Sequence, residues 1–213
     1  MSCKKTRITP GKAQDKKIQE EFRKIILETI EKAKNENSET IFIDPTHQIH
    51  NTVSGYCWQE KGKNNTKIIH SNSGRKRINI IGAINAITHK PTTIITEDNC
   101  DKEMMKLLLS EIRKDYSEAK TIYAFLDNAK YSRNKDVYEH AETLNISLKF
   151  LPPYSPNLNL IERLWKFLKK KLRKNKYYDT FKKFEKAIFE FFRDIEQYKD
   201  ELNKLLTLNF EII

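Results

Sequence analysis

Three carboxylates, Asp44, Asp127 and Glu162, stand at positions from which they could serve phosphoryl chemistry. Asp44 closes the apolar run TIFID, Asp127 closes YAFLD, and Glu162 is the single acid in the basic stretch 151–172. An acid at the end of a buried strand is costly unless it is paired or bound to a cation. Hard divalent ions take oxygen ligands, and two of them about 4 Å apart can activate a water or a 3′-hydroxyl and stabilise a leaving oxygen. We therefore consider a carboxylate site for divalent ions.

Each acid also has an ordinary structural interpretation. Aspartates at strand ends often form Asx turns, and Asp-Asn is a common turn pair. Glu162 completes the pattern Asn159-Leu-Ile-Glu, which fits a capping box with Asn159 as N-cap. A helix starting at Ser155-Pro156 would instead place Glu162 two turns inside it. The residues alone leave these structural roles open beside the metal-site hypothesis.

Positive charge is concentrated in two parts of the chain, whose formal net charge is +11. The stretch from Arg163 to Lys186 contains eleven Lys and Arg residues and only two acids. The stretch 61–79 contains several cations, Lys63 among them, and no acid. Such patches favour a polyanionic partner, nucleic acid above all, because binding releases condensed counterions. The residues expected to contact phosphates are Lys166, Lys169, Lys170 and Arg173 on one helix, and Arg75, Lys76 and Arg77 in a loop.

The periodicity of apolar residues predicts the elements that must position these side chains. Helices are expected over 13–34, 101–116, 133–144, 180–195 and 198–207, with a further helix carrying Glu162. Strands are expected over 40–44 (stopped by Pro45), 52–59, 77–87, 92–96, 121–129 and 146–151. A meander followed by alternating strands and helices predicts an α/β fold, a mixed sheet with helices on both faces. Trp58 and Trp165 are expected in its core.

Composition excludes several classes of protein. No apolar run approaches the roughly 18 residues of a membrane span, and the N-terminus lacks the apolar region of a signal peptide. Three widely spaced cysteines argue against a disulfide framework. We expect a soluble, cytoplasmic chain without a membrane partner.

The stretch from FLDNAKYS to LKFLPPYSPNLNLIERLWKFLKKKL resembles the catalytic core of DDE transposases of the Tc/mariner superfamily, in the bacterial insertion-sequence 630 type. The matching features are a strand ending in Asp-Asn-Ala, the run Leu-Pro-Pro-Tyr-Ser-Pro, the pattern Asn-x-Ile-Glu, and a basic helix. Residues 128–161 place 34 positions between Asp127 and Glu162, as is common in that superfamily. The resemblance covers roughly residues 13–175. Pro45, Ser132 and Leu160 stand where the family commonly has Glu, His and Pro.

The resemblance implies an RNase H-like fold with a mixed five-stranded sheet. It makes Asp44 and Asp127 paired metal ligands and Glu162 the third, for two Mg²⁺ or Mn²⁺ ions, and Asn128 is a candidate for orienting Asp127. It implies cleavage at transposon ends and strand transfer into target DNA by a homodimer, in a bacterial, nucleoid-associated setting. Two alternatives remain: a catalytically inactive DNA-binding remnant, and a structure-selective nuclease without strand transfer.

The expected organisation has three parts: a basic, amphipathic linker helix over 1–38, a catalytic domain over 39–175, and a helical extension over 176–213. Relatives in this family carry helix-turn-helix modules before the catalytic core. Only one helix is expected before the first strand of this sequence. We therefore expect this chain to be the catalytic half, with the helix-turn-helix on a separate upstream polypeptide.

Overall fold

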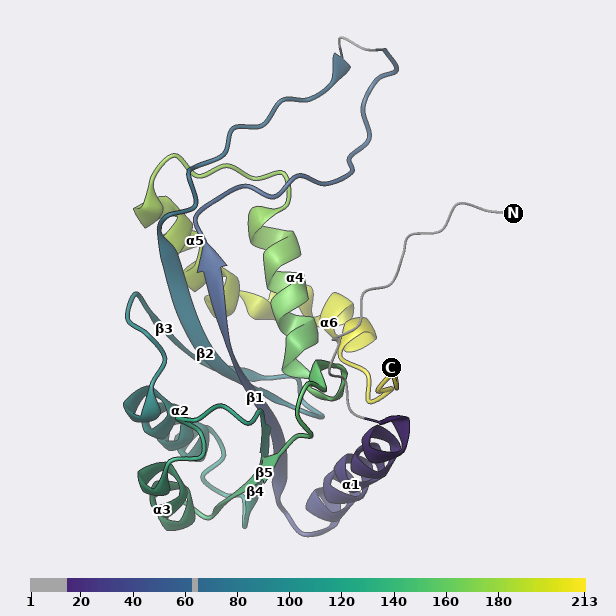
Figure 1. Ribbon diagram of the computed structural model, residues 1–213, viewed down its shortest axis with the longest axis vertical. Helices are drawn as coiled ribbons and strands as arrows, with labels where there is room; N and C mark the ends of the chain where they lie inside the picture. Colours follow the sequence, from purple (N-terminus) through teal and green to yellow (C-terminus); the bar gives the residue numbers. More distant parts are fainter. Residues whose placement is uncertain (1–14, 63–64) are drawn as a thin grey trace, which may run out of the picture.

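A mixed five-stranded sheet forms the centre of the molecule in the computed structural model, which describes residues 15–62 and 65–213 (Figure 1). The strand order is β3-β2-β1-β4-β5. The first three strands pair antiparallel, and β1, β4 and β5 are parallel neighbours. The strands are β1 (Glu39–Ile49), β2 (Arg77–Asn85), β3 (Pro91–Thr96), β4 (Ile122–Leu126) and β5 (Ile146–Phe150). The predicted mixed sheet is confirmed.

Helices cover both faces of the sheet, also as predicted. Alternate side chains of β1 show the division, because successive residues of a strand point to opposite faces. Phe42 packs in a core with residues of α1, α4, α5 and α6, whereas Ile41 and Ile43 pack with α2 and α3. The helices are α1 (Lys16–Asn35), α2 (Lys102–Asp115), α3 (Lys135–Thr143), α4 (Ile161–Arg173), α5 (Phe181–Arg193) and α6 (Lys199–Leu205).

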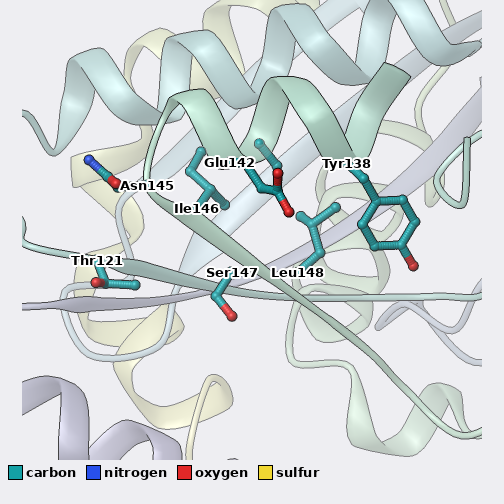
Figure 2. Close-up of a pocket in the computed structure, with 8 residues that line it drawn as sticks. Thr121, Tyr138, Glu142, Asn145, Ile146, Ser147 and Leu148 are labelled. Carbon is teal, nitrogen blue, oxygen red and sulfur yellow. The ribbon is translucent and has the colours of Figure 1, made fainter. Parts of the chain in front are cut away.

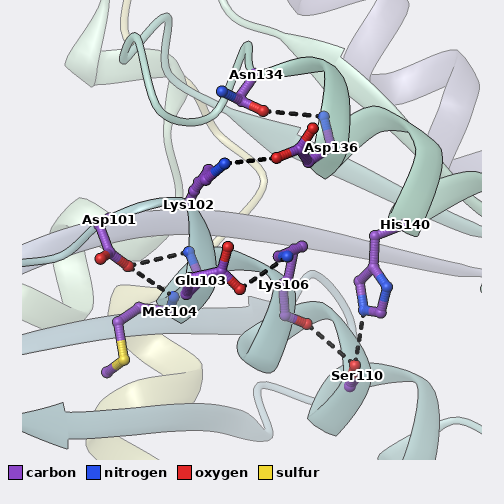
Figure 3. A network of polar contacts seen from close by, with 9 residues as sticks. All are labelled: Asp101, Lys102, Glu103, Met104, Lys106, Ser110, Asn134, Asp136 and His140. Atoms are coloured by element: carbon purple, nitrogen blue, oxygen red, sulfur yellow. Dashed lines mark hydrogen bonds and ion pairs between the residues drawn. The ribbon is translucent and has the colours of Figure 1, made fainter.

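Polar contacts join α2 and α3 into one layer (Figure 3). Lys102 at the start of α2 forms an ion pair of 2.5 Å with Asp136 at the start of α3, and the Ser110 hydroxyl lies 2.8 Å from His140 Nε2. The Asp101 carboxylate caps α2 by accepting from the N–H groups of its first turn. This layer supports the face of the sheet opposite α4.

The first strand is longer than predicted, because Pro45 does not stop it. β1 continues to Ile49 while it stays paired with β2, where Pro45 lies opposite Ile81. Its pairing with β4 ends at Ile43 opposite Leu126. Beyond that point β1 has an open edge, where a proline without an N–H removes no ladder hydrogen bond. The strand therefore passes Asp44 in extended form.

The predicted strand 52–59 is wrong. These residues lie in a long arm between β1 and β2 that extends from the sheet past the C-terminal end of α4 (Figure 1). The root of the arm is bound to the residues after α4: Val53 forms a bridge with Lys174, and Gly55 exchanges two hydrogen bonds with the Asn175 side chain. Trp58, expected in the core, is fully exposed on the arm.

The chain after α4 packs back on the same core as the sheet. Residues of α5, α6 and the segment after them, including Phe210, share the core cluster of Phe42 and α4. Arg163 binds the backbone of that last segment, donating to the carbonyl oxygens of Leu205, Thr207 and Asn209. The expected helices are all present, although residues 1–14 lie outside the described residues. No helix in the described ranges has the length and apolarity needed to cross a bilayer.

Candidate active site

The structure brings the three predicted acids to one pocket. Asp44 follows the last paired residue of β1 with β4, and Asp127 directly follows the last residue of β4. Because these parallel strands lie about 4.8 Å apart, the two aspartates occupy adjacent positions. Glu162 lies in the first turn of α4, which packs over β1. All three acids line a cavity of about 450 Å³ together with the loop 151–156.

The helix that carries Glu162 begins at neither of the two positions expected from the sequence. A short 3₁₀ turn covers Pro156–Leu158, and α4 then begins at Ile161 with Leu160 as N-cap and without a side-chain cap. Asn159 does not cap the helix, because its amide donates to the Ile43 carbonyl of β1 at 3.1 Å. Leu160, which replaces the usual proline, is fully buried. Glu162 thereby reaches the same cavity as the two aspartates.

Asn128 lies in the same cavity but its hydrogen bonds go elsewhere. Its amide donates to the Leu151 carbonyl at the end of β5, and its oxygen accepts from Arg133. The Asp127 carboxylate accepts from the Ala129 N–H at 3.2 Å, as in an Asx turn. Asn128 thus joins the loops after β4 and β5, and its role in orienting Asp127 stays a prediction.

The acids perturb one another. Burial, together with the negative charges of Glu162 and Asp127, raises the pKa of Asp44 to about 8. Burial also raises the pKa of Glu162, against the opposing charges of Lys166 and Lys169. Carboxylates that share one site disfavour each other's ionisation, and a bound cation removes that cost. The electrostatics therefore favour a cation between these acids.

The donors fit a hard divalent ion that keeps part of its own coordination shell. All three are carboxylates, the ligand type that Mg²⁺ and Mn²⁺ prefer. Among the residues the structure describes, no three His, Cys, Asp or Glu side chains are grouped closely enough to hold a metal by themselves. Mg²⁺ is commonly held by one or two carboxylates with waters and substrate phosphate oxygens. An open carboxylate pocket fits that mode of binding.

Exposed lysines follow Glu162 along α4. Lys166, Lys169 and Lys170 are exposed, and the charges of the first two oppose the rise in the pKa of Glu162. Arg173 has a different position from the expected one. Its side chain is 8% exposed, and its guanidinium donates to the backbone and side chain of Asn51. It therefore binds α4 to the root of the arm, and the prediction that Arg173 contacts phosphates is wrong.

The second basic group lies where the arm returns to the sheet. Arg75, Lys76 and Arg77 are exposed just before and at the start of β2. The Lys76 ammonium lies 5.1 Å from the Phe181 ring centre, and Arg77 donates to Asn99. Lys63, counted in this group from the sequence, lies outside the described residues.

A second cavity, of about 430 Å³, lies between α3 and β5 (Figure 2). Its lining contains one carboxylate, that of Glu142, with Tyr138 and polar groups such as Ser147 and Asn145. It lacks the group of three acids that lines the first cavity. The first cavity is therefore the better candidate for a divalent-ion site.

Two contacts at the site involve Trp165 and Asn159, for which only a core position and a helix cap were expected. The Trp165 indole N–H donates to the Asp44 carboxylate at 3.2 Å, and Asn159 bonds to β1 one residue earlier. The sequence contained one signal of the first contact: Gly82 interrupts an otherwise bulky strand, which often marks the close approach of another group. A Cβ at Gly82 would lie 2.7 Å from the Trp165 ring.

The fold and the site together define an RNase H-like nuclease, with two acids on adjacent strands and a third on a helix. A model of the DDE superfamily endonucleases matches residues 39–185. The match covers more than half of the sequence, and the chain belongs to this family.

Solved structures confirm the fold. The catalytic domain of the Mos1 mariner transposase is 15% identical, with a TM-score of 0.60 over 93% of both chains. A Mos1 paired-end complex with the left transposon end has a TM-score of 0.68 at 15% identity, over 99% of this chain and 68% of the other. Mos1 paired-end complexes with Mn and with Mg are also similar.

A curated relative matches in sequence over a shorter range. The uncharacterized protein y4pE/y4sA of Sinorhizobium fredii (strain NBRC 101917 / NGR234) is 30% identical over 82 residues. The match spans 38% of this chain and 58% of that relative. The chain thus matches little more than half of that relative's length.

Proposed function

We propose that this chain is the catalytic part of a DNA transposase, which cleaves DNA at transposon ends and joins the freed 3′-hydroxyl to target DNA. The observation that carries the proposal is the convergence of Asp44, Asp127 and Glu162 in one cavity of a DDE-family fold, beside exposed lysines of α4. Mos1, which shares the fold, has been solved as a paired-end complex with a transposon end and as a strand transfer complex.

In this proposal the three carboxylates hold two divalent ions, Mg²⁺ or Mn²⁺. When bound, such ions activate the attacking water or 3′-hydroxyl and stabilise the leaving oxygen. Asp44 supplies oxygen ligands from within β1, Asp127 from the end of β4, and Glu162 from α4. The raised pKa of Asp44 means that binding an ion displaces a proton from this residue near neutral pH.

The phosphate backbone is held by cations placed beside the acids but not paired with them. Lys166, Lys169 and Lys170 extend along α4 from the cavity, and Arg75, Lys76 and Arg77 form a second group near the arm. Acids and bases occupy different turns and elements, so that the polyanion meets positive charge while the carboxylates stay free for ions. We expect a homodimer to hold two DNA ends, with sequence recognition by a helix-turn-helix polypeptide encoded upstream.

The proposal is tested by metal-dependent cleavage of a supercoiled plasmid that carries the inverted repeats flanking the gene. We expect nicking with Mg²⁺ or Mn²⁺ and none in EDTA. Asp127→Ala should lower the rate by more than about 100-fold, since the loss of even an outer partner of a metal ligand commonly costs 10- to 100-fold. Asp136→Ala is the matched control, because it removes an exposed aspartate of α3 that forms one surface ion pair.

The outcomes separate the three functional classes. Joined products together with cleavage support the transposase. Hydrolysis products alone would favour a nuclease of the same fold, and DNA binding without any cleavage would favour an inactive remnant. Equal nicking by the wild type and Asp127→Ala would refute the assignment of the site.

A further inference from the structure

Trp165 is buried against the strand that carries Asp44. Its side chain is 1% exposed, and its indole N–H donates to Asp44 Oδ2 at 3.2 Å. The ring lies over Gly82, the residue opposite Asp44 in β2. An indole in a core needs a partner for its N–H, and here that partner is an acid of the active site.

Asn159 makes the neighbouring contact. Its side chain is 3% exposed, and its amide donates to the carbonyl oxygen of Ile43, the residue before Asp44. Asn159 and Trp165 stand three residues before and three residues after Glu162. The segment that presents Glu162 is therefore bonded on both sides to consecutive residues of β1.

We propose that Trp165 is a positioning residue for Asp44, which fixes the orientation of the carboxylate before a divalent ion binds. The inference rests on the proposed function, because it assumes that Asp44 is a metal ligand. A carboxylate rotates easily about its last torsion, and the charges of Glu162 and Asp127 act on that of Asp44. A hydrogen bond to one oxygen opposes that rotation, as partners of metal ligands commonly do.

The role belongs to the N–H group and not only to the volume of the ring. Phenylalanine at position 165 would keep an aromatic ring against Gly82 and Phe192, which lies edge-on to the indole at 6.5 Å. It would leave Asp44 without its indole donor. The substitution Trp165→Phe therefore separates the hydrogen bond from most of the packing.

The first experiment measures Mg²⁺ and Mn²⁺ affinity by calorimetry in the absence of DNA. We expect Trp165→Phe to bind these ions about ten-fold more weakly than the wild type. The control is Trp58→Phe, which changes the fully exposed tryptophan of the arm and should bind ions as the wild type does. Thermal unfolding and circular dichroism show whether each variant is folded.

A second measurement keeps Trp165 in place, in case its substitution prevents folding. The chain has two tryptophans, so the Trp58→Phe variant has a single indole N–H signal in ¹⁵N-resolved NMR. We expect this signal to shift when Asp44→Ala is added, and to shift again when Mg²⁺ is titrated into the variant that retains Asp44. A signal that responds to neither change would overturn the inference.

The results also distinguish the inference from the proposed function. Equal Mg²⁺ affinity in the wild type, Trp58→Phe and folded Trp165→Phe would overturn the role of Trp165 alone. Absence of Mg²⁺ and Mn²⁺ binding in the wild type, both without DNA and with a DNA duplex added, would overturn the metal site, and the role of Trp165 with it.

Discussion

The ionised carboxylate of Asp44 is unfavourable in the folded protein unless a cation is bound beside it. Its carboxyl group is partly buried beside two further acids, and these surroundings raise its pKa to about 8. The Trp165 hydrogen bond and the Lys169 charge oppose this shift without cancelling it. A group held in this way lowers the stability of the metal-free fold, because folding must then keep a proton or bury a charge.

The sign of the pH dependence follows from this shift. Below about pH 4, Asp44 is protonated in both the folded and the unfolded chain, and it has no effect on stability. Between about pH 4 and pH 8 the unfolded chain loses the proton while the folded chain keeps it, so this group lowers stability as pH rises. Above about pH 8 the carboxyl group is ionised in both states, and its destabilising effect on the folded protein no longer changes with pH.

We therefore expect Asp44→Asn to stabilise the metal-free protein. Urea unfolding in EDTA should show an increase of about 1 to 3 kcal/mol in the free energy of unfolding at pH 8, and no difference at pH 4 or below. Asp136→Asn is a control of opposite sign, because its hydrogen bond to Lys102 lowers the pKa of Asp136. If Asp44→Asn has the stability of the wild type at every pH, the folded protein does not raise the pKa of Asp44.

From the residues alone the three acids could be predicted only as candidates, because strand-end turns and a helix cap also explained them, and the resemblance to DDE transposases made them metal ligands. The bonds of Asn159 and Trp165 to β1 could not be predicted, since they depend on the depth at which α4 packs on the sheet. The predicted phosphate contact of Arg173 is wrong for a related reason. Its position around the helix matches that of Lys166 and Lys169, but the root of the arm covers its side chain.

At the scale of elements, α4 is the part that turns a sheet with two acids into a site with three. Its apolar face, predicted from helical periodicity, is buried against the sheet at Ile161, Leu164 and Leu168. Gly82 lets the helix approach β2 at the level of Asp44, because no side chain separates the strand from the Trp165 ring. The position of Glu162 therefore depends on Gly82 having no side chain, although Gly82 lies on β2, two strands away from Asp127.

Gly82→Ala should displace this helix. The new Cβ would lie 2.7 Å from Trp165 Cη2 and 3.1 Å from Thr93 Cγ2, and both groups belong to the packed interior. Overpacking of this kind costs typically about 1 to 3 kcal/mol. Chemical unfolding measures that loss, and we expect Mg²⁺ affinity to fall with it.

The matched control is Gly55→Ala at the root of the arm. There the added Cβ would lie 2.1 Å from Lys174 Cε and 2.7 Å from its Cγ, so this flexible side chain has to take another rotamer while the core stays unchanged. We expect a smaller loss of stability than in Gly82→Ala, and unchanged Mg²⁺ binding. A Gly82→Ala protein as stable as this control would show that α4 does not need the close approach.

At the scale of the element order, the pattern of the sequence predicted the sheet, the helices and their two layers. It failed in the segment 52–59, where aromatic and β-branched residues suggested a strand. Tyr56 and Trp58 are exposed in the structure and pack against no core. The periodicity of apolar residues indicates which side chains could be buried. It does not indicate whether another part of the protein packs against them.

For the whole molecule, the dominant electrostatic property is an excess of positive charge. The formal net charge of +11 leads us to expect DNA binding that weakens steeply with salt. Each phosphate contact contributes about −0.9 to the slope of log affinity against log salt concentration on duplex DNA. The double variant Arg75→Ala, Lys76→Ala should therefore reduce the magnitude of the slope by about 2, measured by fluorescence anisotropy.

The control for the salt experiment removes charge from elsewhere. Lys114 and Lys135 are exposed on α2 and α3, on the opposite face of the sheet from α4. Replacing both with alanine should leave the slope nearly unchanged. Equal effects of the two double variants would indicate that net charge alone, and not its placement, determines DNA binding.

The attachment of the arm to the end of α4 has a mechanical consequence. Arg173 and Lys174, at one end of this helix, contact the root of the arm, and Glu162 lies at the other end. The 13 residues of α4 form a rigid rod of about 20 Å. A displacement of the root of the arm that tilted this rod would therefore be felt at the Glu162 carboxylate, at the far end of the same helix.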